Sequence, residues 1–501
     1  MDRSLSLKYF VVILIIILLV AGIAFYLNQR QVHRETYIYP VSITGDLEAP
    51  FLFTGAEDFE RVEIDYRGAH YRVYRMDSIL KKAAPRSDNF DLILLARDGL
   101  AAKISGLQLE EAYLNYSAKY GWEAINLKHP VSSNVKEIEK IIITANDTGT
   151  LPEEALRIIS PEEDFAVLTA GQLLGRGTGY YPYLEGIATV EDQGVSYQNE
   201  KYNWKNVITL EELLEGESAD RILLLGSRGE TLVYRDGLLE ISGNQINYFD
   251  LERDQLIEDL RGIVLDAPLN SIQDIYHDSL YYLEQDERVL IILLDGFGYY
   301  QYLYCLDNEH VPFLASLPEA RKAMSVFKPV TNAGLAATLT GVGPDENGVY
   351  SRKQKDLKSV DIFQKAQDLG KDSIYIEGNI KILNTSIEPE LNPDLNKNGM
   401  TDDEVYESTL KAIEKDAELI YVHFHGIDDY GHQYGPLAAE TMEMIGKTDS
   451  YLRELITRWP GKVLITADHG MHQTEEGGDH GIVSYQDLFV PYIIIDGGGS
   501  Q

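Results

Sequence analysis

The C-terminal part of the chain, residues 271–501, is predicted to be an α/β domain with a mostly parallel sheet and helices on both faces. Continuous apolar runs such as 289–294 (VLIILL) are typical of strands that are buried on both faces. Comparable runs follow at 373–378, 419–424, 462–467 and 492–496. Helical patterns lie at 271–283, 361–370 and 403–416. This alternation of strands and helices favours a parallel sheet that is covered on both sides.

Two small repeated α+β modules are predicted ahead of this domain, at residues 36–150 and 160–265. Each copy has a Tyr-rich strand pattern, then a leucine-containing helical pattern, then an apolar strand that ends in a turn. In chain order these segments are 62–74, 78–83 and 91–104 in the first copy, and 195–204, 209–214 and 220–233 in the second. The stretch 148–164 is the predicted boundary between the two modules.

Both modules faintly resemble the oxidoreductase molybdopterin-binding fold, in which a similar helix-then-strand pattern ends in an Asp-Gly turn. A molybdenum site in that family needs a cysteine ligand. The only cysteine, Cys305, lies beyond both copies. We therefore interpret the modules as binding or spacer elements, and an unrelated pair of small α+β domains is the alternative.

One segment near the N-terminus is apolar enough to cross a membrane. Residues 9–27 contain 19 residues without a charge, enough to span a hydrocarbon core of about 30 Å. A cleaved signal peptide is the alternative, but the apolar run is long for one, and Gly22 and Ala24 make a poor cleavage site. Arg3 and Lys8 precede the segment and favour an N-in orientation. We expect a single-pass transmembrane helix with the large acidic body of the chain outside the cytoplasm.

The charge balance excludes one class of partner. The chain has 44 Lys and Arg residues against 80 Asp and Glu residues, a formal charge of -36. Such a charge repels nucleic-acid backbones, so no nucleic-acid partner is expected. A single cysteine also excludes an internal disulfide framework and any metal site built from several cysteines. A zinc site in this chain must use His and carboxylate ligands.

Histidines and aspartates gather after the predicted strands of the C-terminal domain. Six of the 11 histidines lie between residues 423 and 480. Asp295 follows the first strand run, Asp428 and His432 follow the third, and Asp468 follows the fourth. The carboxyl ends of parallel strands form the functional edge of an α/β sheet. A mixture of His and Asp at this edge suits divalent metal ions.

Four motifs in order then resemble the alkaline phosphatase superfamily, and within it the type I phosphodiesterase/nucleotide pyrophosphatase branch. They are LLDGFG at 293–298, PVTNAGLAATLTGVGPDENG at 329–348, DDYGHQYGP at 428–436, and TADHGM at 466–471 followed by GDHG at 478–481. The resemblance covers roughly residue 288 to the C-terminus. It implies an alkaline-phosphatase-like fold and a hydrolase of phosphoric esters that uses two Zn²⁺ ions or another divalent metal.

The resemblance also implies a ligand set for each metal. One metal would be held by Asp295, Thr331, Asp468 and His469. The other would be held by Asp428, His432 and His480. The spacing from Asp428 to His432 lets both side chains reach one ion if this segment is helical. Asp429 is the nearest false candidate, and a helix-capping Asp428 or a surface His480 are the structural alternatives.

Thr331 is implied as the nucleophile, with a phosphothreonine intermediate. A threonine hydroxyl is a weak nucleophile at neutral pH, and coordination to Zn²⁺ would lower its pKa and align it for attack on phosphorus. We expect Thr331 to begin a helix whose N-terminal amides, including that of Asn332, favour phosphate. An ordinary helix cap is the other role that a threonine can have here.

Arg352 is the candidate determinant of substrate choice. Phosphodiesterase relatives usually carry an Asn a few residues after the turn at 347–348, and here that place is taken by Arg352. An arginine fork binds two phosphate oxygens and would favour a dianionic monoester over a diester. The alternative is an exposed arginine in a basic turn. The sulfatase motif C/S-x-P-x-R is missing, so sulfate esters are disfavoured.

Residues 394–404 (DLNKNGMTDDE) resemble the start of an EF-hand-like or dockerin-like loop. Asp394, Asn396 and Asn398 would supply oxygen ligands to a structural Ca²⁺. Val405 occupies the place of the usual bidentate Glu. A polar turn ahead of a helix is the alternative.

The leading hypothesis is therefore a membrane-anchored hydrolase that acts outside the cytoplasm on a small phosphate ester or a cell-surface substrate. A transferase that moves a phospho-alcohol group onto a cell-surface polymer would share the anchor, the threonine and the metals. A non-catalytic cell-surface binding protein is the alternative from another class. The full ligand set argues against it.

Overall fold

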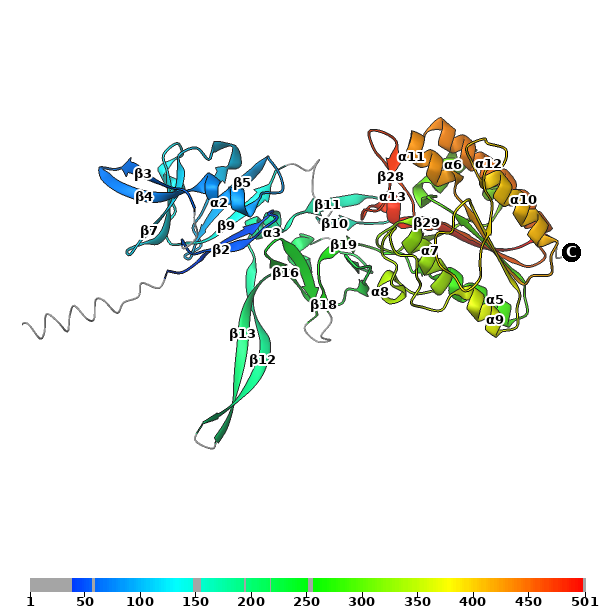
Figure 1. Cartoon of the computed structure of the whole chain (residues 1–501), viewed down its shortest axis with the longest axis horizontal. Coiled ribbons are helices and arrows are strands. Elements are labelled where there is room, and N and C mark those ends of the chain that lie inside the picture. Colours follow the sequence, from blue (N-terminus) through cyan, green and yellow to red (C-terminus); the bar gives the residue numbers. More distant parts are fainter. Residues whose placement is uncertain are drawn as a thin grey trace, which may run out of the picture. The chain divides into compact units, whose positions relative to one another are not determined.

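The computed structural model describes residues 38–55, 59–146, 155–192, 195–216, 218–250 and 256–498 (Figure 1). The chain divides into two compact units, 1–147 and 148–501, which we describe separately. The predicted membrane segment at 9–27 lies outside the described residues. Within the described ranges, no helix combines the length and apolar character needed to cross a bilayer.

The first unit contains two sheets and the helix α2 (Met76–Ala83). The five-stranded sheet has the order β2 (Phe51–Phe53), β1 (Val41–Gly45), β9 (Ile138–Ala145), β5 (Phe90–Ala96) and β6 (Ala101–Ser105). The four-stranded sheet has the order β3 (Arg61–Tyr66), β4 (Ala69–Arg75), β7 (Ala112–Ser117) and β8 (Gly121–Asn126). The Tyr-rich segment at 62–74, expected as one strand, is thus a hairpin of β3 and β4. Phe53, Leu92 and Trp122 are buried in the core of this unit.

The second unit begins with a module that has two sheets, each with five strands. One has the order β11 (Asp164–Leu168), β10 (Leu156–Ile159), β19 (Leu260–Val264), β14 (Leu223–Gly226) and β15 (Thr231–Val233). The other has the order β12 (Gly179–Asp192), β13 (Val195–Thr209), β16 (Leu238–Ser242), β17 (Gln245–Phe249) and β18 (Leu256–Ile257). The helices are α3 (Ala170–Arg176) and α4 (Leu210–Leu213), and each is capped by a threonine in a capping box.

One sheet in each module has the same topology. In the first, β1 pairs antiparallel with β2 and parallel with β9, and β9, β5 and β6 then pair antiparallel. In the second, β10 pairs antiparallel with β11 and parallel with β19, and β19, β14 and β15 then pair antiparallel. The residue limits expected for the modules stay a prediction.

The C-terminal domain is a mixed α/β fold around one eight-stranded sheet. Its strand order is β20 (Asn270–Ser271), β22 (Arg321–Met324), β29 (Phe489–Asp496), β26 (Lys462–Thr466), β21 (Val289–Leu294), β25 (Leu419–Phe424), β23 (Ser373–Glu377) and β24 (Glu390–Leu391). Every pair of neighbours is parallel except those that involve β29. The expectation that the run at 492–496 joins the parallel set is therefore wrong. A buried apolar run has the same pattern in either direction.

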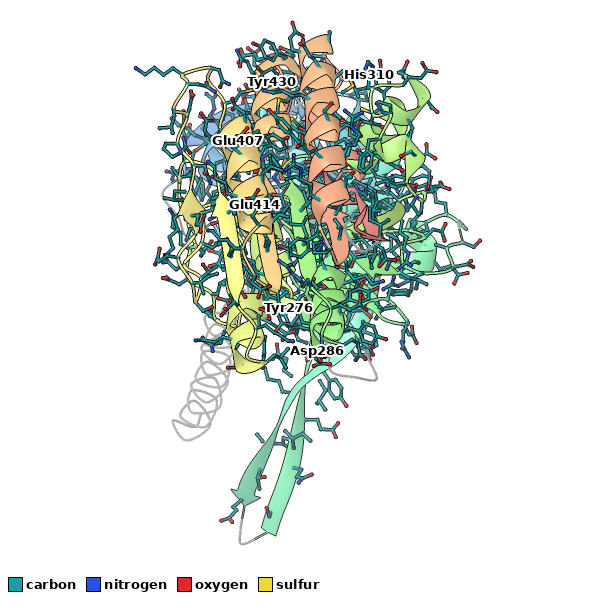
Figure 2. The ribbon with its side chains drawn as sticks, turned by 90° about the vertical axis from the view of Figure 1, so that its right-hand side faces the viewer. Tyr276, Asp286, His310, Glu407, Glu414 and Tyr430 are labelled. Atoms are coloured by element: carbon teal, nitrogen blue, oxygen red, sulfur yellow. The ribbon has the colours of Figure 1, made fainter. Side chains whose placement is uncertain are left out.

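Helices cover both faces of this sheet (Figure 1). One group is α5 (Asp274–Glu284), α7 (Thr331–Thr340), α8 (Pro344–Asn347) and α9 (Ile362–Asp368). The other group is α6 (Tyr299–Asp307), α10 (Asp402–Ile413), α11 (Gly426–Tyr434) and α12 (Ala439–Arg458). Figure 2 shows Glu407 of α10, Glu414 at the C-cap of α10 and Tyr430 of α11 on the side of this second group that faces the viewer. The remaining elements are the helix α13 (Tyr485–Leu488) and the two-stranded pair of β27 (His472–Gln473) and β28 (Gly478–Asp479).

The second module and the C-terminal domain share a small hydrophobic core. Leu225 of β14 and Val264 of β19 pack in it with Phe327, Val483 and Phe489 of the domain. All of these side chains are buried. The module is therefore packed directly against the part of the domain that carries residues 483–489.

Candidate active site and metal centre

The site is built at the carboxyl ends of β21, β25 and β26. Asp295 follows β21 directly, and its backbone N–H donates to Phe424 O at the end of β25 (2.9 Å). Gly296 then turns the chain with φ +75, and a Cβ there would meet Asp428 Oδ1 at 2.9 Å. A side chain at position 296 would be strained and would press on a candidate metal ligand, so glycine suits this position.

The first candidate metal group consists of Asp295, Asp468 and His469. His469 Nε2 lies 3.4 Å from Asp295 Oδ1 and 3.4 Å from Asp468 Oδ2. All three side chains are buried, and their ligand atoms lie within 4.8 Å of one another. The structure therefore brings together three of the four residues that the sequence motifs assign to one ion.

Thr331 lies beside this group, and its hydroxyl Oγ1 is 3.3 Å from His469 Nε2. Val330 occupies the N-cap position of α7, and Thr331 is the first helical residue. Thr331 is therefore not the N-cap residue of α7, and the side chain of Val330, which is, makes no capping hydrogen bond. The Thr331 hydroxyl is thereby directed to the metal group at the start of a helix.

The second candidate group is formed by Asp428, His432 and His480. The two carboxylate oxygens of Asp428 face different histidines: Oδ2 is 3.4 Å from His432 Nε2, and Oδ1 is 3.7 Å from His480 Nε2. Asp428 and His432 are four residues apart on α11, so they project from the same side of the helix. Asp428 and His480 meet the distances of a metal group together with His469, whereas none of the metal groups among the described residues includes His432.

Each of these histidines is held in one tautomer by a backbone carbonyl. The Nδ1 atoms of His432, His469 and His480 donate to the carbonyls of Gly478 (2.9 Å), Gly470 (3.0 Å) and Pro329 (2.8 Å). Because a carbonyl only accepts, Nδ1 must carry the proton and Nε2 the lone pair. This arrangement is typical of metal-binding histidines, whose second nitrogen donates to a carbonyl or carboxylate.

The carboxylates of both groups fit a pair of dications. Asp295 Oδ1, Asp428 Oδ1 and Asp468 Oδ2 are buried without a hydrogen-bond partner among the described residues. Burial and the neighbouring carboxylates raise the pKa of Asp428 and of Asp468 well above its usual value. Buried anions at this density need positive charge between them. The donor set of His nitrogens and carboxylate oxygens suits Zn²⁺.

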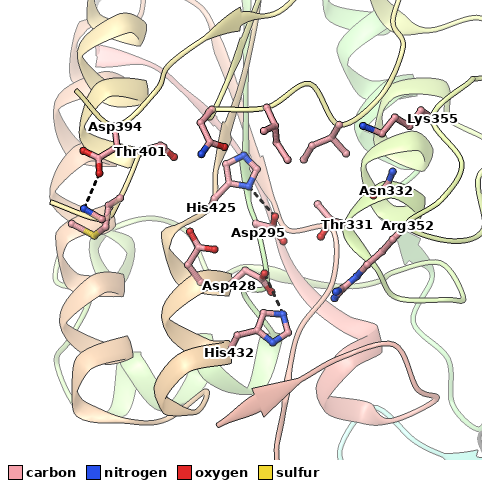
Figure 3. Close-up of a pocket in the computed structure, with 16 residues that line it drawn as sticks. Asp295, Thr331, Asn332, Arg352, Lys355, Asp394, Thr401, His425, Asp428 and His432 are labelled. Atoms are coloured by element: carbon pink, nitrogen blue, oxygen red, sulfur yellow. Dashed lines mark hydrogen bonds and ion pairs between the residues drawn. The ribbon is translucent and has the colours of Figure 1, made fainter. Parts of the chain in front are cut away.

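A cavity of about 530 Å³ opens onto these residues. Its wall includes Thr331, Asn332, Arg352 and Lys355, and Figure 3 shows Arg352 reaching toward the centre of the pocket from the side that carries Thr331. Asn332 Nδ2 donates to Gln354 O (2.9 Å) and so fixes the loop that carries Arg352. Two cations and a hydroxyl thus face the carboxylates across the cavity.

The loop at 394–404 lies at the rim of the same cavity through Asp394 and Thr401. Asp394 accepts backbone N–H groups of Lys397, Asn398 and Gly399. The side-chain oxygens of Asn396 and Asn398 accept the next amides, from Asn398 and Met400. Asp403 Oδ1 and Glu404 Oε2 have no partner among the described residues. The loop therefore has a compact turn, and two carboxylates that were not among the calcium ligands expected from the sequence.

Three further polar residues at the site were not assigned from the sequence. His423 and His425 lie beside Asp295, and Glu377 lies on their other side. Glu377 is the last residue of β23, which runs parallel to β25 with Ile376 opposite Val422. The sequence shows an acidic residue at the end of one apolar run and histidines at the end of another, but it does not show that the two strands are neighbours.

A comparison with protein families relates this domain to one of them. The model of the type I phosphodiesterase/nucleotide pyrophosphatase family matches residues 289–491, which is the greater part of the C-terminal domain. The C-terminal domain is therefore similar to this family, as its motifs indicate. The match includes every candidate metal ligand from Asp295 to His480. No curated protein matches the chain.

Solved structures similar to this chain include murine ectonucleotide pyrophosphatase/phosphodiesterase 5 in complex with AMP, at 20% identity and a TM-score of 0.31. The match covers 38% of this chain and 59% of that one. Phosphonoacetate hydrolase from Sinorhizobium meliloti 1021 in complex with phosphonoformate has 20% identity and a TM-score of 0.31, over 37% and 57% of the two chains. The chain thus spans less than two thirds of the length of each.

Proposed function

We propose that this protein is a metal-dependent phosphohydrolase that acts on a phosphate monoester or diester through a phosphothreonine on Thr331. The observation that carries the proposal is the convergence of Thr331 Oγ1 with His469 Nε2, whose lone pair also faces Asp295 and Asp468. A hydroxyl at the start of a helix, next to a buried dication site, is suited to nucleophilic attack on phosphorus.

In this proposal, Asp295, Thr331, Asp468 and His469 would hold one Zn²⁺, and Asp428, His432 and His480 would hold the other. Zinc bound by these residues would supply Lewis acidity and positive charge to the reaction. The Thr331 hydroxyl gives up its proton as Oγ bonds to phosphorus, and the bond from phosphorus to the leaving oxygen breaks. Water then attacks the same phosphorus and gives up a proton, the bond from phosphorus to Oγ breaks, and Thr331 regains a proton as the product leaves. The N-terminal amides of α7 orient the phosphoryl group, and Arg352 binds its outer oxygens.

Arg352 supports a dianionic substrate. A guanidinium at the wall of the cavity matches two oxygens of a terminal phosphoryl group, whereas a diester offers one charge less. Lys355 lines the same wall and adds positive charge. We therefore place phosphate monoesters ahead of diesters as substrates.

Two further parts of the proposal concern the surroundings of the site. Residues 9–27 anchor the chain in the cell membrane as a single helix, with the enzyme outside the cytoplasm. A mature N-terminus near Phe25 would refute the anchor.

The loop at 394–404 binds a structural Ca²⁺ through Asp394, Asn396 and Asn398. The oxygens of Asp403 and Glu404 that have no partner among the described residues support this site.

The test of the function is turnover by the purified full chain after loading with Zn²⁺. Phosphomonoesters, bis-aryl diesters, nucleotides and phosphonoacetate would be compared, and the protein would be quenched in acid during turnover. We expect release of phosphate or of a phosphomonoester, and mass spectrometry should locate a phosphoryl group on Thr331. Activity in the wild type without any phosphorylated threonine would reject the covalent route.

The same experiment separates the alternatives. A transferase would pass the phospho-group to an added alcohol or polymer faster than to water, so the ratio of transfer to hydrolysis would rise with acceptor concentration. A non-catalytic binding protein would turn over none of the substrates, although it would retain zinc.

A further inference from the structure

We propose that this protein holds a further divalent cation, beside the two zinc ions and the calcium ion of the loop at 394–404, between Asp295, His423 and His425, with Glu377 fixing the two histidines. This inference rests on the proposed function, because Asp295 would be shared with the zinc site beside Thr331. The ligand would be a metal ion that accepts imidazole, of the class of Zn²⁺ or Mn²⁺. The site is built entirely from residues that neither proposed zinc ion uses, except for Asp295.

The two carboxylate oxygens of Asp295 face different groups. Oδ1 lies toward His469 at 3.4 Å, whereas Oδ2 lies 3.1 Å from His425 Nδ1 and 3.4 Å from His423 Nε2. Figure 3 shows the contact between Asp295 and His425 at the cavity. One oxygen is therefore available for each of two neighbouring cations, which is a common way for a carboxylate to bridge metals.

Glu377 binds the far side of both imidazoles. Its Oε2 is 3.1 Å from His423 Nδ1, and its Oε1 is 2.5 Å from His425 Nε2. Tyr375 Oη and the amide of Gly378 donate to the same carboxylate at 2.6 and 2.9 Å. Glu377 is fully buried, and four contacts use its whole acceptor capacity. A carboxylate that holds the distal nitrogens of histidines is the usual outer shell of a metal site.

On the side of the two rings away from Glu377, the remaining imidazole nitrogens face the carboxylate oxygen of Asp295. Each ring has one nitrogen toward Glu377 and the other toward Asp295 Oδ2, and the 3.1 Å contact of His425 Nδ1 is a hydrogen bond only when Nδ1 carries the proton. When each ring proton is on the Glu377 side, as a bound cation would require, His423 Nε2 and His425 Nδ1 present lone pairs to the point where Asp295 Oδ2 lies. His423 is fully buried, and its Nε2 has no hydrogen-bond partner among the described residues. Two lone pairs and a carboxylate oxygen directed at one point attract a cation. These three atoms also meet the distance requirement of a metal group.

The position on the sheet explains why the group is rigid. His423 belongs to β25, between β21, which ends before Asp295, and β23, which ends at Glu377. His425 follows two residues later, and its backbone N–H donates to the buried Asp402 (2.8 Å). Neighbouring strands of the sheet therefore fix the donors before any ion binds, which lowers the entropic cost of binding.

The test is the number of ions bound per chain. The purified full chain would be stripped with a chelator and titrated with Zn²⁺ or Mn²⁺, and bound metal would be counted by plasma mass spectrometry after gel filtration. With Ca²⁺ kept in excess to fill the loop at 394–404, we expect three zinc or manganese ions in the wild type and two in His423→Gln and in Glu377→Gln. His472→Gln is the matched control, because His472 also pairs with a buried carboxylate, Asp487 (2.8 Å), outside every metal group. It should bind three ions.

Each outcome bears on the proposal. Two ions in the wild type and in all variants would overturn the further site and mean that two protonated imidazoles neutralise Asp295 and Glu377. Zero or one ion in the wild type would overturn the zinc centre of the proposed function as well. If His423→Gln does not fold, Glu377→Gln gives the same count, because it keeps the size of the side chain and removes only the charge. An anomalous difference peak between His423 Nε2 and Asp295 Oδ2 in a crystal soaked with Mn²⁺ would locate the ion.

Discussion

Arg352 directs its guanidinium Nη2 to Nε2 of His480, at 2.6 Å. A guanidinium only donates, so His480 must accept through the nitrogen that also faces Asp428. Burial, together with the nearby His469 and Arg352, lowers the pKa of His480 to about 2. The imidazole is therefore neutral at physiological pH, and a guanidinium lies directly beside a candidate metal ligand.

This proximity predicts that Arg352 acts on the phosphoryl group. Arg352→Ala should lower kcat/KM for a phosphomonoester by about 10- to 100-fold, because a charge-assisted hydrogen bond contributes about 1.5–3 kcal/mol. The loss for a bis-aryl diester should be only a few-fold. Steady-state kinetics on both substrates would measure the two ratios. Lys353→Ala, one residue away and exposed, is the matched control, and equal losses on both substrates would contradict the role.

The hydroxyl of Thr331 provides the second prediction. Thr331→Ala should abolish turnover and leave the fold and most of the bound zinc intact, because Asp295, Asp468 and His469 remain. Thr331→Ser keeps a nucleophile and should retain measurable activity. Turnover, zinc content and circular dichroism would be measured together. Near-normal turnover of a good substrate by Thr331→Ala would rule out the phosphothreonine mechanism.

The third prediction concerns the Asp428 group. Asp428→Ala or His480→Ala should each lower bound zinc by about one ion per chain relative to wild type, because the two residues belong to one inferred site. Asp429→Asn is the matched control, since Asp429 is the neighbouring acid on α11 and belongs to no metal group. Unchanged metal content in both ligand variants would show that the assignment is wrong.

A pH-dependent contribution to stability is expected from Asp487. Burial raises its pKa to about 6, although His472 and the amides of Gly481 and Ile482 donate to it. The usual pKa is 3.8, so the folded state binds this proton more tightly than the unfolded state. The free energy of unfolding should therefore fall as pH rises from about 4 to 6, and two pKa units correspond to about 3 kcal/mol.

Urea unfolding of wild type and Asp487→Asn at a series of pH values would measure this effect as a difference. The amide does not titrate, so wild type should lose stability relative to the variant across this window. A difference that stays constant between pH 4 and 7 would contradict the shifted pKa.

Short segments of the sequence were enough to predict several strands of the fold and several residues of the candidate site. Runs such as 289–294 and 419–424 predicted buried parallel strands, because their composition requires two covered faces. The direction of β29 was not predictable, since a buried apolar run has no pattern that distinguishes parallel from antiparallel pairing. The ordered motifs located Asp295, Thr331 and Asp468, which the structure places together.

The group around Glu377 could not be predicted in the same way. Glu377, His423 and Asp295 are far apart in sequence and meet only because β23, β25 and β21 are neighbours. Strand order is a property of the whole sheet, and none of these short segments records it. Asp403 and Glu404 were not predicted as calcium ligands, because the loop motif has its bidentate Glu at the place of Val405. In this chain the nearest carboxylates come one and two residues before that place.

Strand β29 has a consequence for the order of events during synthesis. It is the last strand of the sheet in chain order, yet it lies inside the sheet, where β22 and β26 flank it. His480 also comes late, shortly before β29, whereas its partner residues come from earlier elements. A chain that emerges from the ribosome N-terminus first therefore has neither a complete sheet nor all of the candidate metal ligands until β29 and the segment before it are available. The earlier modules can fold before this domain, because their sheets do not include β29.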